Sequence, residues 1–578
     1  MNNLTACPLD CYDACAINQS DGKLKALKHG HTQGFLCPHL NHYEKYEQIS
    51  QPRYMGKEIS LDEALIKFKE ILAATNRDEI LHYRGFGNFG LMQGVTDHFF
   101  ASHGAILTDG SLCDGAGEAG IIAGRGSNKN MPLSEIAKSE VVLFWGRNPH
   151  VTNSHILPLL EGKTIIVIDP VKTKIAKIAE LYIQIKPHTD ISLAMLLCRF
   201  LHIHNGCDTE FLEEYASEFE EYYELTQGIR IKATLEEMDV TLGQIGKILE
   251  LVKNKKVAIV CGVGVQKYSD GADVLRAIDA FAVMLGLFGK EGCGVAYLGN
   301  SKEGITSPFN TKAKRVSKVN TEFDNYKTVF IQGSNPLSQM PNSLRVKESL
   351  SKVEKIVYFG LYENETSEAA HLIIPAKSFL HKNDIRTSYS HNALMKMNRV
   401  RESDSGISEY DLSSYLCREF GIEIESEEFY LSHFASFGIQ KTDSSYAVRE
   451  REEIPYKNGF DTKTKEFQFL EELDIVPTQE DSLFLITPKS SRSLNSQFKR
   501  EESVYMHPSL GFNENEEVTI SSACGSVKLK AKNCDDIRED CVLIYSGTKG
   551  VNNLTSSKHS LEGKNAIFQE EKVKVARG

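Results

Sequence analysis

The N-terminal segment carries four cysteines whose spacing could hold an inorganic centre. Three thiols stand at four-residue steps and a fourth lies further on: Cys7, Cys11, Cys15 and Cys37. Four thiolates can bind a tetrahedral zinc ion or the corners of a 4Fe-4S cube. Structural zinc sites tend to pair their ligands two and two, whereas this set is three plus one. The spacing therefore favours a 4Fe-4S cluster over zinc, with unliganded or paired cysteines as the remaining alternative.

A fifth cysteine, Cys113, lies among glycines in a segment that is predicted to be a loop entering a helix. Backbone N–H groups at such a position favour a thiolate. No histidine follows closely enough in sequence to act as its base, so a protease-type nucleophile is poorly supported. Two interpretations remain from the pattern alone: a sulfur ligand to a soft metal, or a small buried side chain.

The middle of the chain contains an approximate internal duplication. An apolar run at residues 141–145 ends in Gly146-Arg147-Asn148-Pro149, and another at residues 328–332 ends in Gly333-Ser334-Asn335-Pro336. Strands that alternate with helices predict parallel sheets, whose ligands bind at the carboxyl ends of the strands. Because each unit places a Gly-x-Asn-Pro turn at that end, the sequence predicts two related nucleotide sites.

An acidic residue closes the next strand of the first unit. Asp169 follows the apolar run at residues 164–168. A carboxylate in this place can accept a hydrogen bond from a ribose hydroxyl or a base amine, as in dinucleotide folds. The alternative is that Asp169 and the two Asn-Pro pairs are turn residues without a ligand.

Length and composition set the broad class of the protein. At 578 residues the chain exceeds the usual size of one core, so several domains are expected. The net charge of −12 argues against a general nucleic-acid binder. No apolar run approaches the ~20 residues needed to span a bilayer, and the first residues do not have the pattern of a signal peptide. We therefore expect a cytoplasmic address without direct membrane insertion.

The C-terminal part of the chain changes character. Short apolar runs separated by polar turns lie at residues 483–487, 517–520, 526–530 and 541–545. This spacing predicts a small β-barrel.

Taken in order, these motifs resemble those of the molybdopterin oxidoreductases of the DMSO-reductase type, over nearly the whole chain. The cysteine opening with Gly34-Phe35-Leu36-Cys37 looks like the family's cluster-binding segment, and Gly110-Ser111-Leu112-Cys113 looks like its metal-ligand loop. The two Gly-x-Asn-Pro turns, with Ile168-Asp169-Pro170, look like its guanine-dinucleotide segments. The stretch from Thr487-Pro488-Lys489 to Asn552 looks like its C-terminal barrel.

The resemblance implies a molybdenum or tungsten ion held by two pterin guanine dinucleotides, together with a 4Fe-4S cluster on the four N-terminal cysteines. Cys113 would be the protein ligand to the metal. By matching position, the dinucleotides would be held by Asn148, Asp169, Asp190 and Asn335, and the pterins would contact Ser493, Asn495 and Asn552. Asp114 and His155 would be the nearest candidates for proton handling, and His155 is close enough in sequence to Asn148 to join that site.

The expected fold is α/β and multi-domain, with two related α/β dinucleotide-binding domains around a cofactor cleft. A small N-terminal iron–sulfur domain and a C-terminal β-barrel that contacts the pterins complete it. The expected boundaries are residues 1–55 for the iron–sulfur domain, 138–324 for the first dinucleotide domain, 56–137 with 325–480 for the second, and 481–578 for the barrel.

Three positions depart from the family's pattern. His39 stands where the family has a lysine between cluster and pterin, and the charge of a histidine depends on pH near neutrality. Electron transfer is then either tuned differently or impaired. Pro187-His188-Thr189-Asp190 replaces the usual Pro-Gly-Thr-Asp turn. Asp114 stands where formate dehydrogenases of the family place a histidine, so formate is disfavoured as a substrate.

The expected activity is transfer of two electrons to or from a small substrate. The absence of an evident NAD or flavin domain implies a separate electron-carrier protein or iron–sulfur subunit. A non-redox hydratase on the same cofactor is one alternative. A degenerate subunit that wires electrons or has a structural role, without a working pterin, is the other.

Overall fold

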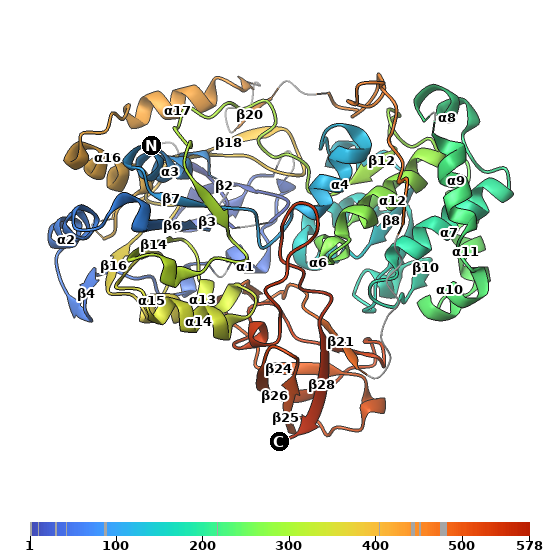
Figure 1. Ribbon diagram of the computed structural model, residues 1–578. Coiled ribbons are helices and arrows are strands. Elements are labelled where there is room, and N and C mark those ends of the chain that lie inside the picture. Colours follow the sequence, from blue (N-terminus) through green and yellow to red (C-terminus); the bar gives the residue numbers. More distant parts are fainter. Residues whose placement is uncertain are drawn as a thin grey trace.

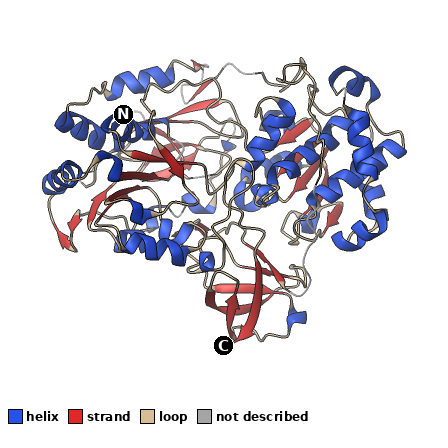
Figure 2. Ribbon diagram, in the orientation of Figure 1, coloured by secondary structure: helices blue, strands red, loops and turns tan. Residues whose placement is uncertain are grey.

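The computed structural model places two α/β bodies side by side, with a small β-barrel below them (Figure 1). Helices cover the sheets of both bodies, whereas the barrel consists mainly of strands (Figure 2). The structure describes residues 3–578 except 10, 29–31, 42, 86–89, 217, 404, 441–445, 450–451 and 474–481. Of the helices it describes, none is both long and apolar enough to span a bilayer. The arrangement confirms the predicted multi-domain α/β fold.

The first body is built on a five-stranded sheet in which all neighbouring strands run parallel. Its order is β10-β9-β8-β11-β12, with β8 at Val141–Trp145, β9 at Thr164–Ile168, β10 at Leu181–Ile183, β11 at Val257–Cys261 and β12 at Gly294–Ala296. Every residue of β8 and β11 is buried, as expected for parallel strands with both faces covered. The strands predicted at residues 141–145 and 164–168 are confirmed as β8 and β9.

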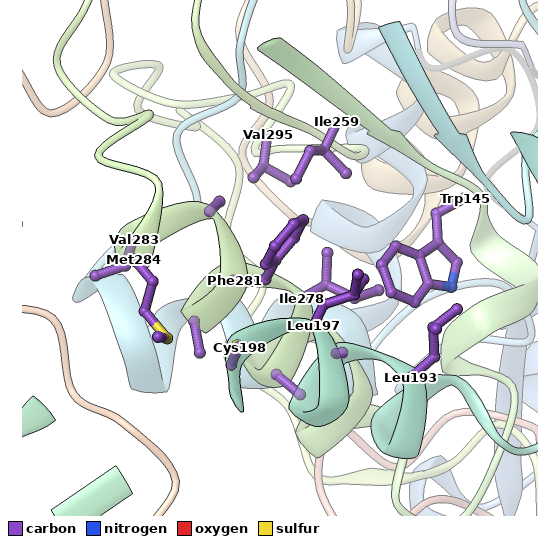
Figure 3. Packing of buried hydrophobic residues seen from close by; sticks show 14 of the residues in the cluster. Trp145, Leu193, Leu197, Cys198, Ile259, Ile278, Phe281, Val283, Met284 and Val295 are labelled. Atoms are coloured by element: carbon purple, nitrogen blue, oxygen red, sulfur yellow. The ribbon is translucent and has the colours of Figure 1, made fainter. Parts of the chain in front are cut away.

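Two helices supply much of the core on one face of this sheet. Trp145 of β8 packs towards Leu197 of α7 (Asp190–Ile203) and Ile278 of α12 (Gly271–Met284) (Figure 3). The indole N–H of Trp145 also donates to the Asp190 carboxylate at 2.6 Å. The core of the first body is thus joined directly to a residue that the sequence assigns to a nucleotide site.

The second body contains an eight-stranded sheet assembled from segments far apart in the chain. Its order is β13-β7-β6-β14-β15-β16-β4-β5, with β4 at Arg53–Tyr54, β5 at Lys57–Glu58, β6 at Ile80–Arg84, β7 at Ile106–Asp109, β13 at Arg315–Ser317, β14 at Thr328–Gln332, β15 at Lys355–Gly360 and β16 at Leu372–Pro375. The strands from β13 to β16 are parallel, and β4 pairs antiparallel with β16. The predicted strand of the second unit, β14, lies in the middle of this sheet.

The N-terminal cysteines lie beside a small antiparallel sheet. It consists of β1 (Leu4–Ala6), β2 (Ala16–Ser20) and β3 (Lys23–Ala26). β1 lies against β18 (Ala393–Met397), part of a four-stranded sheet with β17 (Asp384–Arg386), β20 (Tyr446–Val448) and β19 (Ile439–Gln440). Arg386 of β17 donates to the Leu9 carbonyl at 2.6 Å, and so ties the cysteine segment to that sheet.

The C-terminal strands close into a barrel, as predicted. Its order is β21-β27-β24-β26-β25-β28, with β21 at Leu483–Ile486, β24 at Ser503–Met506, β25 at Glu517–Ser521, β26 at Ser526–Asn533, β27 at Cys541–Leu543 and β28 at Lys572–Arg577. Apolar side chains such as Leu485, Val504 and Val542 fill the interior. In a barrel of this size, side chains are enough to fill the interior.

A buried ion pair joins two helices of the first body. Arg125 of α4 (Ala116–Arg125) donates through Nε to Asp279 of α12 at 2.7 Å, and its Nη2 binds the other carboxylate oxygen. The two residues are 1% and 0% exposed. The Asp279 carboxylate is the anion that this buried guanidinium binds, and the Arg125 guanidinium also lies over the Phe288 ring at 4.8 Å.

Asp279→Asn should destabilise the first body strongly, because it leaves the Arg125 guanidinium buried without a carboxylate. We expect a loss of about 3–5 kcal/mol in the free energy of unfolding, measured with urea. The matched control is Glu250→Gln on α11 (Leu242–Val252), which removes the partner of Lys247 in an exposed pair and should cost less than ~1 kcal/mol. Equal losses in the two variants would contradict this account.

Candidate functional site

One cavity of about 1570 Å³ brings together nearly all residues that the sequence assigned to a site. It is lined by the four N-terminal cysteines and by His39, Cys113, Asp114, Asn148, His155, Asp169, Asp190, Asn335, Asn495 and Asn552. Ser493 does not line it, but its backbone carbonyl accepts a hydrogen bond from His39 Nε2 at 3.2 Å. The cavity therefore has walls from both α/β bodies, the N-terminal cysteine segment and the C-terminal barrel domain.

The four N-terminal cysteines, called the quartet below, carry free thiols. The Cys7 N–H donates to the Cys15 carbonyl at 2.8 Å, and the Leu9 N–H donates to Cys7 Sγ at 3.4 Å. Burial raises the pKa of the Cys7 thiol to about 12. Burial also raises the pKa of Cys15, and the nearby thiols of Cys7 and Cys11 add to this shift. Thiols in this environment ionise together only around a cationic centre, so the donor set fits an iron–sulfur cluster.

Cys113 lies in a loop that enters α4, as predicted. The hydroxyl of Ser111 accepts hydrogen bonds from the backbone N–H groups of Cys113 and Asp114, at 2.9 and 3.3 Å. α4 begins at Ala116, and the Asn565 amide oxygen accepts from the Ala116 N–H at 2.6 Å. The loop backbone is thus fixed from within and from the barrel side, which orients the Cys113 thiol.

Polar side chains from the first body surround the Cys113 loop. The Tyr297 hydroxyl donates to the Asp114 carboxylate at 2.8 Å, and burial raises the pKa of Asp114 to about 6. Gln266 donates to the Cys113 carbonyl at 2.9 Å. The Lys267 ammonium donates to the Leu112 carbonyl, and burial lowers the pKa of Lys267 to about 8.

Sequence reasoning did not select these three neighbours of the loop. Gln266 and Lys267 follow the turn after β11, so a glycine-containing turn at the end of an apolar strand could have pointed to them. Tyr297 follows β12 and carries no comparable signal. Its position depends on tertiary packing alone.

The first Gly-x-Asn-Pro turn lies at the carboxyl end of β8, where the backbone is crowded. A Cβ at Gly262, after β11, would lie 1.7 Å from the Gly146 carbonyl oxygen. Asn148 precedes α6 (Pro149–Thr152). Several buried polar atoms near this turn have no hydrogen-bond partner among the described residues: Arg147 Nε and Nη2, Asn148 Oδ1, His150 Nδ1, both Asn153 amide atoms and Thr173 Oγ1. Such atoms cost free energy unless a ligand satisfies them, so they fit a polar nucleotide.

Two buried carboxyl groups complete this half of the cavity. Asp169 accepts from the Val171 N–H at 2.8 Å, and Asp190 is held by the indole of Trp145. Burial raises the pKa of Asp169 to about 7 and that of Asp190 to about 6. Among the described residues neither forms an ion pair with a lysine or arginine. Both are therefore suited to accept N–H groups from a base.

His188 takes the place of a glycine in the turn before Asp190. Its φ of +68° lies in the left-handed region, so the turn keeps the backbone shape that glycine adopts readily. The imidazole stacks on Tyr268 at 4.3 Å between ring centroids, and Nε2 lies 2.9 Å from the Asp270 carboxylate. These contacts hold His188 in a backbone conformation that favours glycine, so the turn before Asp190 is kept.

The second Gly-x-Asn-Pro turn is built differently. The Asn335 amide nitrogen donates to Glu365 at 2.8 Å and to Ser496 at 3.1 Å, and its oxygen accepts from Thr366 at 2.7 Å. Unlike Asn148, this side chain already has protein partners. In the barrel, Asn552 likewise donates to the Ser338 carbonyl at 2.7 Å. The two turns therefore present unequal polar surfaces to the cavity.

His155 lies beside the quartet. Its ring nitrogens are 3.8 and 3.9 Å from Cys15 Sγ, and Nδ1 is 3.0 Å from the Asp13 carboxylate. The ring stacks on Phe35 at 4.3 Å between centroids. These contacts place the His155 imidazole against the quartet.

Comparisons with known proteins agree with this geometry. A family model described as molybdopterin oxidoreductase matches residues 95–405, and one described as molybdopterin dinucleotide-binding domain matches residues 483–569. The chain is 25% identical to the probable oxidoreductase YyaE of Bacillus subtilis, over 84% of this chain and 81% of that protein. It is 25% identical to formate dehydrogenase H of Escherichia coli, over 65% of this chain and 62% of that protein. Acetylene hydratase from Pelobacter acetylenicus has a similar fold, with a TM-score of 0.79, 15% identity and 100% coverage of both chains.

Asp169 should make the stability of the nucleotide-free chain depend on pH. The folded-state pKa of Asp169, about 7, lies above the usual value of 3.8, so the folded state binds the proton more tightly than the unfolded state. The stabilisation from this difference is fully present below about pH 4 and is lost as the pH rises to about 7 and above. We expect Asp169→Asn to flatten this fall, and to be more stable than the wild type by on the order of 2 kcal/mol at about pH 8. Urea unfolding at several pH values measures it. Asp21→Asn, at an exposed turn, is the control, and an unflattened slope in Asp169→Asn would contradict the assignment.

Proposed function

Because the chain belongs to the molybdopterin oxidoreductase family, we propose that it is a molybdenum- or tungsten-dependent oxidoreductase that holds two pterin guanine dinucleotides and a 4Fe-4S cluster. The family matches confirm the resemblance predicted from the motifs. The observation that carries the proposal is the single cavity, which is lined by the quartet, Cys113 and both Gly-x-Asn-Pro turns. Its volume exceeds the ~300–1,000 Å³ of ordinary small-ligand pockets, as a large cofactor requires.

Each part of the cavity would hold one part of the cofactor set. Cys113 would bind the metal through Sγ, and the quartet would bind the cluster. Asn148, Asp169 and Asp190 would hold one dinucleotide, and the turn at Asn335 the other. The barrel would contact the pterins through its polar segments near Asn495 and Asn552.

When bound, the metal supplies two-electron chemistry and the cluster passes electrons singly. The chain's own residues orient the reacting groups. The Gln266 amide fixes the Cys113 carbonyl, and the Tyr297 hydroxyl orients the Asp114 carboxyl beside the thiol ligand. This makes Asp114 the group best placed to hold a proton for a small substrate. Formate remains disfavoured as that substrate.

The quartet would exchange electrons with a separate carrier protein or iron–sulfur subunit. His155 packs against Cys15, and His39 follows Cys37 and reaches the Ser493 carbonyl. Both histidines therefore lie where they would influence electron transfer between cluster and pterin. Burial lowers the pKa of His39, which favours its neutral form at neutral pH, unlike a lysine in this position.

Elemental analysis of anaerobically purified protein, with pterin fluorescence after oxidation, tests the proposal. We expect iron at the level of one 4Fe-4S cluster, molybdenum or tungsten, and pterin in the same chain. Iron without molybdenum, tungsten or pterin would instead support the wiring or structural subunit. Complete cofactors without turnover with any artificial electron acceptor or donor would support the hydratase.

Cys113→Ser should change the spectrum of the molybdenum or tungsten centre while leaving iron content and the cluster signal as in the wild type. The reason is that oxygen replaces sulfur in the proposed metal ligand, whereas the quartet is untouched. Electron paramagnetic resonance and X-ray absorption measure the two centres separately. Cys207→Ser, a partly buried cysteine outside the cavity, is the matched control and should alter neither. An unchanged metal spectrum in Cys113→Ser would refute the ligand assignment.

A further inference from the structure

Arg147 is a buried cation that has no anionic partner among the residues that the structure describes. It lies inside the first Gly-x-Asn-Pro turn, lines the cavity and is 4% exposed. Its Nε and Nη2 atoms are buried and have no hydrogen-bond partner among the described residues, and no ion pair to Arg147 is found there. A guanidinium buried in this way costs free energy unless an anion binds it.

Three arginine–carboxylate pairs elsewhere in the chain use this edge of the guanidinium, whereas Arg276 binds two backbone carbonyls through it. Arg84 donates to the Asp97 carboxylate through Nε and Nη2 at 3.1 and 2.6 Å. Arg538 donates to the Asp540 carboxylate through the same two atoms at 2.9 and 3.0 Å. Arg125 uses this edge on Asp279. In each of these three pairs, two parallel N–H groups bind two oxygens of one anion. The same edge of Arg147 is therefore suited to a group with two adjacent anionic oxygens.

A stacked aromatic ring fixes the plane of the Arg147 guanidinium. Its central carbon lies 4.7 Å from the centroid of the Tyr12 ring. Tyr12 belongs to the quartet segment, is 4% exposed, and is held by a 2.6 Å hydrogen bond from the Asn130 amide to its hydroxyl. Arginine is the residue that stacks on an aromatic face while its edge binds an oxyanion.

The position of Arg147 in the sheet indicates which anion it binds. From β8 the chain continues to β9 and β10 on one side, whereas β11 and β12 lie on the other, so the strand order reverses between β8 and β11. Nucleotides bind at the carboxyl ends of strands at such a reversal, with their phosphates close to the glycine-containing turn. Gly146 and Gly262 bring the two strand ends together there.

We propose that Arg147 binds phosphate oxygens of the dinucleotide in the first site through its Nε/Nη2 edge, while its face on Tyr12 joins that dinucleotide to the quartet segment. The inference rests on the proposed function, since it assumes pterin guanine dinucleotides as ligands. Arg147 is then a cofactor-binding residue, and Tyr12 is a positioning residue that acts through it.

The test compares purified holoenzyme variants by their content of guanosine monophosphate released with acid, and of iron. We expect Arg147→Met to lose one of the two guanine nucleotides, a roughly twofold fall, with iron unchanged. Arg147→Lys keeps the positive charge but lacks the two parallel N–H donors of the guanidinium. Its nucleotide content should therefore lie between those of Arg147→Met and the wild type. Tyr12→Phe should retain the wild-type content because the ring remains, whereas Tyr12→Leu should lose nucleotide. Arg230→Met is the matched control, an exposed arginine of the first body that does not line the cavity, and should lose none.

The outcomes separate this inference from the function on which it rests. Wild-type nucleotide content in both Arg147 variants would overturn the role of Arg147 and leave the proposed function intact. Nucleotide and iron lost together in both Arg147 variants would show general misassembly, and would also overturn it. A wild-type protein that contains iron but no guanine nucleotide would overturn the proposed function itself, and this inference with it.

Discussion

The cavity depends on one constraint. At the carboxyl ends of neighbouring strands, the two backbones touch with no side chain between them. A Cβ at Gly262 would clash with the Gly146 carbonyl, and a Cβ at Gly85 would lie 2.3 Å from the Gly333 carbonyl. Each pair joins two adjacent parallel strands at their carboxyl ends, once in each body. Any larger side chain would push these ends apart and displace the turns that follow. The two turns face one cavity because glycine permits both contacts.

The duplication is one of backbone and not of side-chain environment. Asn148 Oδ1 is buried and finds no partner in the described part of the chain, whereas Asn335 is hydrogen-bonded to Glu365, Ser496 and Thr366. Glu365 also pairs with Arg500 at 2.7 Å, so a network of protein groups occupies the second turn. Two dinucleotides in such halves would be held by different chemistry. Around Asn148, buried donors and acceptors are open to a ligand. Around Asn335, a ligand would have to displace the protein groups that already bind the Asn335 side chain.

Much of the fold follows from patterns that are local in sequence. The apolar runs of β8, β9 and β14 became buried strands, and the short runs at the C-terminus became a closed barrel. These predictions succeeded because period and burial are set by neighbouring residues. The two motif asparagines also reached the cavity, since the carboxyl ends of parallel strands converge.

What the sequence did not reveal depends on tertiary packing. His155 stacks on Phe35 and contacts Cys15, far from it along the chain, and nothing in its own surroundings predicts this. Tyr297 approaches Asp114 for the same reason. Sequence proximity suggested that His155 joins the site of Asn148, and both residues line the one cavity, but proximity did not reveal the contact with the quartet.

The assembly of the eight-stranded sheet has a consequence for the newly made chain. β6 and β7 are synthesised before the first body, but the partner of β6 on its other side, β14, is synthesised after it. At translation rates of about 5–20 residues per second, β6 waits roughly ten to fifty seconds for its neighbour. During that interval an apolar strand keeps an open edge, which is a hazard for aggregation. Biogenesis of this protein therefore passes through a half-built sheet while the body inserted within it can already be compact.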